Sequence, residues 1–270
     1  MSRSSEPLFP TTVADQPRDD SDGWPFGWAT ARAEALTWEP PALPTTVVVP
    51  HPDDEVLMFG GLIQLQRLRG VEVFVVAVTD GDAAYPGVDA DRLGTIRRGE
   101  HERALAKLGV GRGAVHRLGL PDGAVAESEA ALVDSIVDAI VELDTPLVVA
   151  PWANDHHRDH EASGRAARVA GDRTGAATYF GLFWSWTHTD PAMLVRQRLL
   201  RLPLTPDLLA GRRAAIAEHR SQVTDDIAPA MLSEGTLRPL DWTDEYYIAA
   251  TLDENLIADL HSCTTYMESP

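Results

Sequence analysis

The chain has 270 residues, of which 44% are hydrophobic, and this length is sufficient for one large α/β core without a second domain. Its formal net charge is −18 at pH 7. A surface this acidic repels nucleic-acid phosphates and anionic lipid, so we expect no nucleic-acid partner. The same negative field tolerates a neutral or cationic small molecule.

The cysteine content and the hydropathy restrict the possible bonding and cellular location of the chain. Cys263 is the only cysteine, which excludes an internal disulfide and a thiolate metal cluster. No stretch approaches the ~20 apolar residues that a membrane-spanning helix needs, and the first residues lack the apolar segment of a signal peptide. We therefore expect a cytoplasmic protein without a membrane span, and we leave a homo-oligomer open.

The first 42 residues are rich in Pro, Asp and Trp and show no clear period. We interpret residues 1–42 as an irregular arm with a short helix around 29–35. Trp24, Phe26 and Trp28 would pack this arm on the domain, which disfavours disorder.

From residue 43 onward, short apolar strands alternate with helices. The predicted strands are 46–50, 71–79, 115–118 and 146–152, and the predicted helices are 56–68, 95–108, 127–143 and 160–173. This alternation is typical of a parallel sheet covered on both faces. Right-handed crossovers then predict a Rossmann-like, doubly wound α/β fold with a mostly parallel sheet, so we treat 43–270 as a single domain.

The pattern weakens beyond Ala177 and is least defined from about residue 190. A strand over 179–186, a helix over 206–220 and a strand over 245–251 remain recognisable. These elements either extend the sheet or form a small cap.

Each of the four early strands ends in a polar cluster. The clusters are 51–55 (HPDDE), 79–82 (TDGD), 119–123 (GLPDG) and 154–160 (NDHHRDH). In an open parallel sheet the carboxyl ends of the strands line one crevice, where ligands bind. Clusters far apart in the sequence should therefore meet in space.

Together these clusters supply a plausible set of metal ligands. His51 and Asp54 are three residues apart at the start of a predicted helix, a spacing that can place both on one side. With His160 from the opposing loop, they form a common catalytic zinc set that leaves one position open for water. Iron or cobalt could use the same ligands. The adjacent Asp53 could accept the proton of that water.

Simpler interpretations exist for each cluster alone. Asp53, Asp54 and Glu55 could be acidic residues favoured at a helix N-terminus by its free amides and dipole. His157 and His160 could belong to a solvated polar loop. The expected meeting of both clusters in one crevice favours a metal site.

The strings in this sequence resemble the LmbE-like (PIG-L) family of zinc de-N-acetylases. The resemblance rests on 50–55 (PHPDDE), 79–81 (TDG), 118–123 (LGLPDG), 150–152 (APW) and 157–160 (HRDH). It covers roughly residues 45 to 190 and is fainter over 217–222 (AEHRSQ). It implies a Rossmann-like fold and the hydrolysis of an N-acetyl group, typically on a glucosamine unit.

The resemblance also implies residue roles. By position, His51, Asp54 and His160 match the metal ligands, and Asp53 matches the general base.

His157 matches a residue that stabilises the oxyanion or donates a proton, with Asp159 behind it to orient its ring. Arg97 aligns with an arginine on the substrate side of the site. Arg158 departs from the family, where Pro is frequent, and should affect the stiffness of the loop more than its chemistry.

Three further residues are candidates for substrate contact. Trp184 and Trp186 would share one face of a predicted strand and could form an aromatic wall for a sugar, although ordinary packing explains them as well. His219 could approach the site or could be a structural histidine.

Within the family, the chain length and the Trp-containing arm are similar to deacetylases of glycopeptide-antibiotic biosynthesis. We therefore expect zinc-dependent hydrolysis of an N-acetylglucosaminyl glycoconjugate, above all a glycopeptide pseudoaglycone, to acetate and a free amine. The alternatives are a mycothiol-type or free amino-sugar substrate, or a zinc- or sugar-binding module without turnover. A nucleotide binder is disfavoured because the first strand leads into HPDDE and not into a glycine-rich loop.

Overall fold

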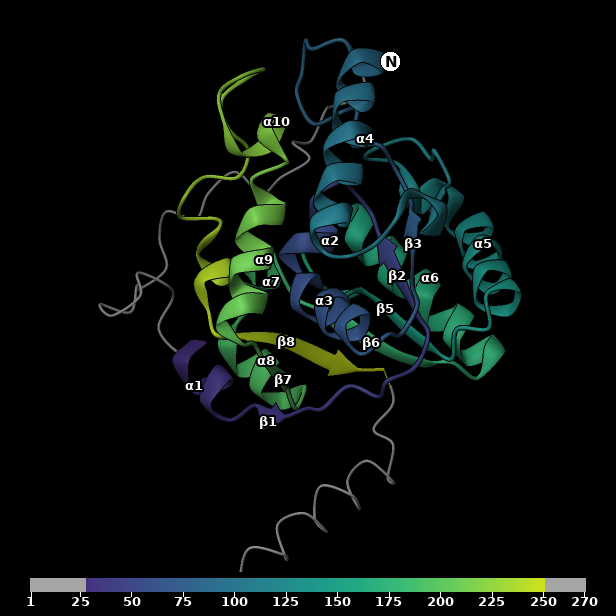
Figure 1. The fold of residues 1–270 in the computed structure, drawn as a ribbon, viewed down its shortest axis with the longest axis vertical. Helices are drawn as coiled ribbons and strands as arrows, with labels where there is room; N and C mark the ends of the chain where they lie inside the picture. Colours follow the sequence, from purple (N-terminus) through teal and green to yellow (C-terminus); the bar gives the residue numbers. More distant parts are fainter. Residues whose placement is uncertain (1–27, 251–270) are drawn as a thin grey trace, which may run out of the picture.

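In the computed structural model, residues 28–250 are described, and a mixed eight-stranded sheet lies at their centre (Figure 1). The strands are β1 (Leu36–Thr37), β2 (Thr45–Val49), β3 (Val73–Ala77), β4 (Val115–Arg117), β5 (Leu147–Pro151), β6 (Ala177–Gly181), β7 (Leu200–Pro203) and β8 (Asp244–Ala249). Their order across the sheet is β1-β7-β8-β6-β5-β2-β3-β4. Within residues 28–250, β8 alone runs against the other strands, pairing antiparallel with β6 and β7.

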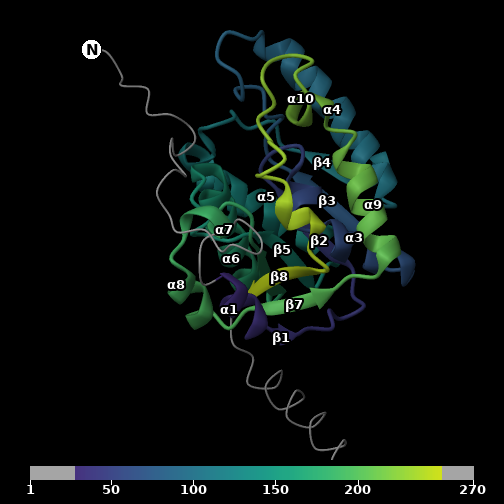
Figure 2. The ribbon, with the colours of Figure 1, turned by 90° about the vertical axis from the view of Figure 1, so that its left-hand side faces the viewer.

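Two helical layers enclose this sheet (Figure 2). The helices are α1 (Trp28–Ala33), α2 (Asp54–Leu57), α3 (Gly60–Leu68), α4 (Ala90–Lys107), α5 (Glu129–Glu142), α6 (Arg158–Thr174), α7 (Ser185–His188), α8 (Pro191–Arg196), α9 (Pro206–Ile216) and α10 (Arg220–Val223). Short 3-10 turns are η1 (Arg112–Ala114), η2 (Val125–Ser128) and η3 (Arg238–Asp241). The predicted fold class, a mostly parallel sheet with helices on both faces, is confirmed.

The pleat of β2 explains how both layers are held. Val47 and Val49 pack into a cluster with residues of α2, α3, α4 and α9. Val48, between them, points to the opposite face and packs with residues of α5 and α6. Because neighbouring side chains of a strand point to opposite faces, an unbroken apolar strand requires a core on each side.

The helix predicted over 56–68 is in fact two helices, α2 and α3, separated at Met58 and Phe59. Glu245 of β8 explains the break, because its carboxylate accepts hydrogen bonds from the backbone N–H groups of Gly61 (2.5 Å) and Leu62 (3.0 Å). These amides begin α3 and need a partner outside the helix. Glu245 is that partner, and it comes from β8, far from α3 in the sequence.

The strand predicted over 179–186 is wrong after Gly181, where β6 ends. The buried carboxylate of Asp155 accepts hydrogen bonds from the N–H groups of Phe183 (3.1 Å) and Ser185 (2.9 Å). These contacts turn the chain into α7. Trp184 and Trp186 therefore do not share a strand face.

Residues 191–250 extend the sheet through β7 and β8 and do not form a separate cap. β8 is close to the predicted strand, whereas β7 and β1 have no counterpart in the prediction. The predicted packing of Trp24, Phe26 and Trp28 on the domain concerns side chains that the structure does not describe, and Cys263 lies outside residues 28–250. None of the helices between residues 28 and 250 has the length and apolar character required to span a membrane.

The strand order places a functional crevice at one point of the sheet. β2 pairs with β3 on one side and with β5 on the other. The loops that follow β2 and β5 therefore leave the sheet in opposite directions, which is a topological switch point where ligands bind in open α/β sheets.

Helix α6 approaches this crevice closely through Gly164. A methyl group at this position would overlap the carbonyl oxygen of Pro151 and lie 2.8 Å from the backbone nitrogen of Ala153. We expect Gly164→Ala to lower the free energy of unfolding by about 1–3 kcal/mol, because backbone atoms cannot move aside cheaply. Denaturant titration measures this change.

Gly113→Ala is the matched control, since nothing lies within 4 Å of its added methyl group. Equal stability of the two variants would contradict the close backbone contact.

Candidate active site

Three side chains meet at the switch point. His51 follows β2, Asp54 begins α2, and His160 lies in the first turn of α6. Asp54 Oδ2 lies 3.2 Å from His51 Nδ1 and 3.3 Å from His160 Nε2. All three side chains are buried. The structure thus brings together the three predicted metal ligands.

The spacing of these atoms suits a metal ion. In a tetrahedral site with bonds of about 2.0–2.1 Å, neighbouring donor atoms lie about 3.3 Å apart. The two distances to Asp54 Oδ2 match this value, and two imidazoles with one carboxylate are ligands that zinc-type ions prefer. Among the described residues, two groups have ligand atoms that all lie within 4.8 Å of one another: His51, His157 and His160, and His51, Asp122 and Asp159.

A buried carboxylate orients His160. Its Nδ1 lies 2.9 Å from Asp155 Oδ2, which can only accept, so Nδ1 carries the hydrogen and Nε2 faces Asp54. Such carboxylate–histidine pairs typically support metal ligands. Burial lowers the pKa of His160, but the Asp54 charge and the Asp155 hydrogen bond outweigh it and raise the pKa to about 9. Asp155 stands in the predicted 154–160 cluster, but its sequence context alone predicted no role for it.

His51 is oriented in a similar way by two other carboxylates. Its Nε2 lies 3.3 Å from Asp122 Oδ1 and 3.2 Å from Asp159 Oδ2, which leaves Nδ1 toward Asp54. Burial opposes protonation of His51, but the hydrogen bonds to these carboxylates raise its pKa well above the usual value. Surroundings that favour a proton on the ring also favour a metal cation. Asp122 lies in the predicted GLPDG cluster but was not singled out.

The backbone of Asp53 is unusual. It has φ 122° and ψ −29°, and its side chain makes no capping hydrogen bond although it stands at the N-cap of α2. Such a conformation costs about 1–3 kcal/mol in a residue with a side chain, so the surroundings must impose it. Capping therefore does not explain this acidic residue.

Arg97 of α4 contributes to that constraint. Its Nη2 donates to Pro52 O (2.7 Å) and to Asp53 Oδ2 (3.2 Å), and its Nη1 donates to Gly81 O (2.8 Å). The guanidinium thus holds the loop after β2 while it lines the cavity. Its predicted contact with substrate stays a prediction.

The carboxyl of Asp53 has an electrostatic environment suited to proton transfer. Burial raises its pKa to about 7, with the charge of Arg97 lowering it and that of Asp54 raising it. A group with a pKa near the working pH exchanges protons most effectively. The geometry therefore suits Asp53 to the predicted role of base.

His157 lies beside the three predicted metal ligands. It is the N-cap of α6, and its Nδ1 accepts a hydrogen bond from the N–H of Asp159 (3.3 Å). Its ring meets that of His51 edge-on, with centroids 4.8 Å apart. Burial lowers its pKa well below the usual value, so the imidazole is neutral. A neutral ring whose Nδ1 accepts carries its hydrogen on Nε2.

The carboxylate of Asp159 is anchored by backbone amides. Oδ2 accepts from Gly123 N–H (2.7 Å) and Oδ1 accepts from Val125 N–H (3.2 Å). Oδ2 also faces His51, as described above. The predicted support of His157 by the Asp159 side chain stays a prediction.

A cavity opens over these groups. Its lining comprises His51, Asp53, Asp54, Leu57, Ala84, Arg97, Asp122, His157, His160, Trp184, Gln222, Met231 and Leu232. Trp184 is thus at the cavity, as a substrate contact would need to be. Trp186 is 2% exposed and packs against Trp242 and Tyr246, so the structure does not bring it to the site.

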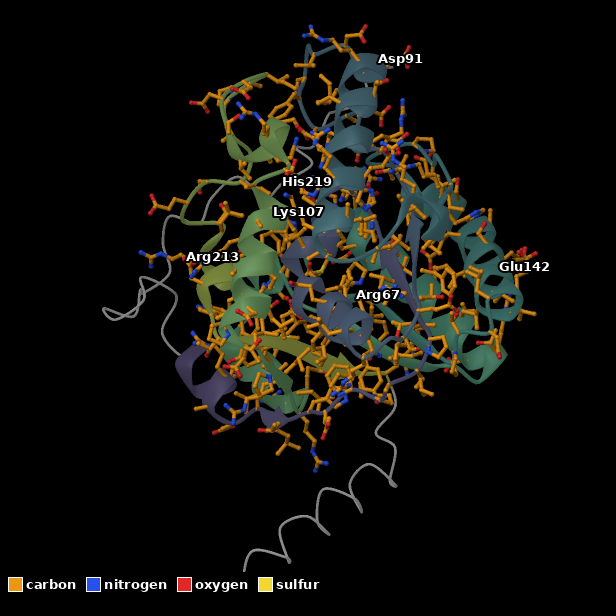
Figure 3. The ribbon with its side chains drawn as sticks, in the orientation of Figure 1. Arg67, Asp91, Lys107, Glu142, Arg213 and His219 are labelled. Atoms are coloured by element: carbon orange, nitrogen blue, oxygen red, sulfur yellow. The ribbon has the colours of Figure 1, made fainter. Side chains whose placement is uncertain are left out.

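His219 is fully buried where α9 passes into α10, next to α4 (Figure 3), and it is absent from the cavity lining. Its Nε2 lies 2.6 Å from Glu55 Oε1. Glu55 Oε2 in turn accepts a hydrogen bond from the N–H of Asp53 (2.9 Å). Burial raises the pKa of Glu55, but the charges of His101 and His219 outweigh it and lower the pKa. From the sequence alone, Glu55 had no predicted role beyond favouring the N-terminus of a helix.

Comparison with known proteins agrees with this chemistry. The family GlcNAc-PI de-N-acetylase (PIG-L) matches residues 46–170. A 1D-myo-inositol 2-acetamido-2-deoxy-alpha-D-glucopyranoside deacetylase of Mycolicibacterium vanbaalenii is 31% identical over 255 residues, covering 74% of this chain and 88% of that protein. A probable N-acetyl-alpha-D-glucosaminyl L-malate deacetylase of Bacillus cereus is 32% identical over 127 residues, covering 44% of this chain and 57% of that protein.

Among solved structures, a deacetylase of the A40926 pseudoaglycone matches with a TM-score of 0.63 at 22% identity, covering 77% of this chain and 97% of that chain. At this identity the likeness shows the fold alone. The inositol-glycoside deacetylase of Mycolicibacterium vanbaalenii goes further, because it combines 31% identity with 74% of this chain and 88% of its own length. The chain therefore belongs to the GlcNAc-PI de-N-acetylase (PIG-L) family and is a de-N-acetylase of the N-acetylglucosamine type.

Proposed function

We propose that the protein uses a zinc ion to remove the acetyl group from an uncharged N-acetylglucosaminyl glycoside, with an inositol glycoside of the mycothiol type as the favoured substrate. The observation that carries the proposal is the meeting of His51, Asp54 and His160 at a cavity that also contains the buried carboxyl of Asp53. Two imidazole nitrogens with one carboxylate oxygen favour zinc over magnesium or calcium.

Two groups of the chain would carry the proton transfers. A metal held by the three ligands supplies a Lewis acid, which polarises the acetamide carbonyl and acidifies a water molecule. Asp53 accepts a proton from the attacking water, in line with its pKa of about 7. His157 donates a hydrogen bond through Nε2 to the carbonyl oxygen as negative charge develops there. The departing amine takes its proton from Asp53 or from His157, which gives acetate and a free amine.

The electrostatics of the cavity support an uncharged aglycone. Asp53, Asp54 and Asp122 contribute carboxyl groups to its lining, and Arg97 is the one arginine among the described lining residues. The guanidinium of Arg97 already donates to Pro52, Gly81 and Asp53. A carboxylate on the aglycone would therefore meet like charges, and the one arginine of the lining is already engaged with other groups.

The relatives in sequence support the inositol glycoside over the expected glycopeptide pseudoaglycone. The inositol-glycoside deacetylase aligns over 88% of its length at 31% identity. The pseudoaglycone deacetylase shares the fold at 22% identity, which carries no argument about substrate. We therefore place the mycothiol-type alternative ahead of the antibiotic substrate.

The proposed role of Asp53 as the base is tested by a first variant. Asp53→Asn should retain the metal and lose turnover by about 10²–10⁴-fold, because an amide cannot accept the proton of water. Steady-state kinetics and elemental analysis on the same preparation measure both quantities. His160→Ala is the contrasting variant, which should lose the metal. Wild-type turnover in Asp53→Asn would refute the role of Asp53.

The contact between Asp155 and His160 is tested by a second variant. In Asp155→Asn, the N–H groups of Phe183 and Ser185 keep the amide oxygen on their side, so the amide nitrogen faces His160 Nδ1. The hydrogen of the ring then moves to Nε2, the nitrogen that binds the metal. We expect metal affinity to fall about 10–100-fold, measured by competition with a chelator.

The control for this variant is Asp138→Asn, which changes an exposed carboxylate on α5. Unchanged affinity in Asp155→Asn would show that Asp155 does not set the tautomer of His160.

The choice of substrate is tested by acetate release from three N-acetylglucosaminyl compounds. They carry inositol, malate or a glycopeptide pseudoaglycone, and each is assayed with and without a chelator. We expect chelator-sensitive release with the highest kcat/KM for the inositol glycoside. Release confined to the pseudoaglycone would restore the antibiotic substrate, and preference for the malate glycoside would contradict the electrostatic argument.

A further inference from the structure

The peptide bond between Pro52 and Asp53 is held at both of its polar ends. Its carbonyl oxygen accepts a hydrogen bond from Arg97 Nη2 (2.7 Å), and its N–H donates to Glu55 Oε2 (2.9 Å). The orientation of this peptide plane sets φ of Asp53, which is 122°. Residues with a side chain rarely adopt this region, so the two contacts hold the backbone from which the Asp53 side chain projects.

Glu55 is itself held rigidly. Its side chain is fully buried, and its carboxylate lies between two histidines from other elements. Oε1 is 2.6 Å from His219 Nε2, and Oε2 is 3.5 Å from His101 Nε2 of α4. These contacts prevent the carboxylate from turning away from the N–H of Asp53.

We propose that Glu55 is a positioning residue for Asp53, and that His219 holds Glu55 in this role. The proposal rests on the proposed function, in which Asp53 is the base. Glu55 and His219 are both absent from the cavity lining, so their influence on the reaction passes through Asp53. Efficient proton transfer needs the base within hydrogen-bond reach of the attacking water, and a shift of about 1 Å can cost 10²-fold in rate.

The proposal also gives a role to the faint motif over 217–222. His219 stands 164 positions after Glu55, in a segment whose Gln222 lines the cavity. Ser221 in the same segment donates through its N–H and Oγ to Glu100 of α4 (2.8 and 2.6 Å). The segment is therefore anchored on α4, the helix that also carries Arg97. Arg97 holds the carbonyl end of the Pro52–Asp53 peptide bond, and Glu55 holds its N–H end.

The decisive experiment is a double-mutant cycle of Asp53→Asn and Glu55→Ala in metal-loaded protein, with kcat, KM and metal content measured for an N-acetylglucosaminyl substrate. Glu55→Ala should lower kcat by about 10–100-fold and leave KM and metal content unchanged. In the Asp53→Asn background, Glu55→Ala should lower kcat no further, because the base that Glu55 positions is already inactive. Glu55→Gln should recover most of the loss, since its amide oxygen can accept from the N–H of Asp53.

A variant farther from the metal keeps the test valid if Glu55→Ala does not fold. His219→Ala should reproduce the loss of kcat, and His219→Gln should restore it by donating to Glu55 Oε1. Glu245→Gln is the matched control, because Glu245 is another buried carboxylate that accepts from backbone amides. It should lower Tm without lowering kcat.

The outcomes separate the two proposals. Wild-type kcat in folded, metal-loaded Glu55→Ala, or an equal loss with and without Asp53→Asn, would overturn the positioning role and leave the proposed function intact. A fully active Asp53→Asn protein would overturn the assignment of the base, and the positioning role with it.

Discussion

The contacts of Asp54 Oδ2 with His51 and His160 are the constraint on which the site depends. They join the loop after β2 to the first turn of α6, two segments more than a hundred residues apart in the chain. Burying a carboxylate is costly unless positive charge and hydrogen bonds compensate it. The two imidazoles provide that compensation, so the packing of α6 against β5 and the chemistry of the site are parts of one arrangement.

A second set of acidic groups surrounds the first. Asp155 orients His160, Asp122 and Asp159 orient His51, and Glu55 holds the backbone of Asp53. Asp122 and Asp159 come from other segments than His51, whereas Asp155 lies five positions before His160 and Glu55 reaches back two positions to Asp53. Because both predicted histidine ligands have carboxylate partners, their orientation is set before a substrate arrives.

Much of this arrangement was predictable because its signals are local. Apolar strands ending in HPDDE and NDHHRDH indicated both the sheet and the crevice where His51, Asp54 and His160 meet. The positions where helix 56–68 is interrupted and where strand 179–186 stops were not predictable, because remote residues cause them. Glu245 accepts a hydrogen bond from an amide at the start of α3, and Asp155 accepts one from Phe183 just after β6. The position of Trp186 in the core, the role of Glu55 and strands β1 and β7 likewise depend on tertiary contacts.

Asp155 has a consequence for how enzymes of this fold can diversify. One carboxylate both fixes the ring of His160 and accepts the amides of residues 183 to 185, which carry Trp184 to the cavity. The backbone of this rim is thus tied to His160, the proposed ligand, and cannot be remodelled without disturbing it. The side chain at position 184 can still be replaced, and so can the lining at Met231 and Leu232. Their backbone N–H groups bond to Tyr85 and Gln222 and, among the described contacts, to none of the three proposed ligands.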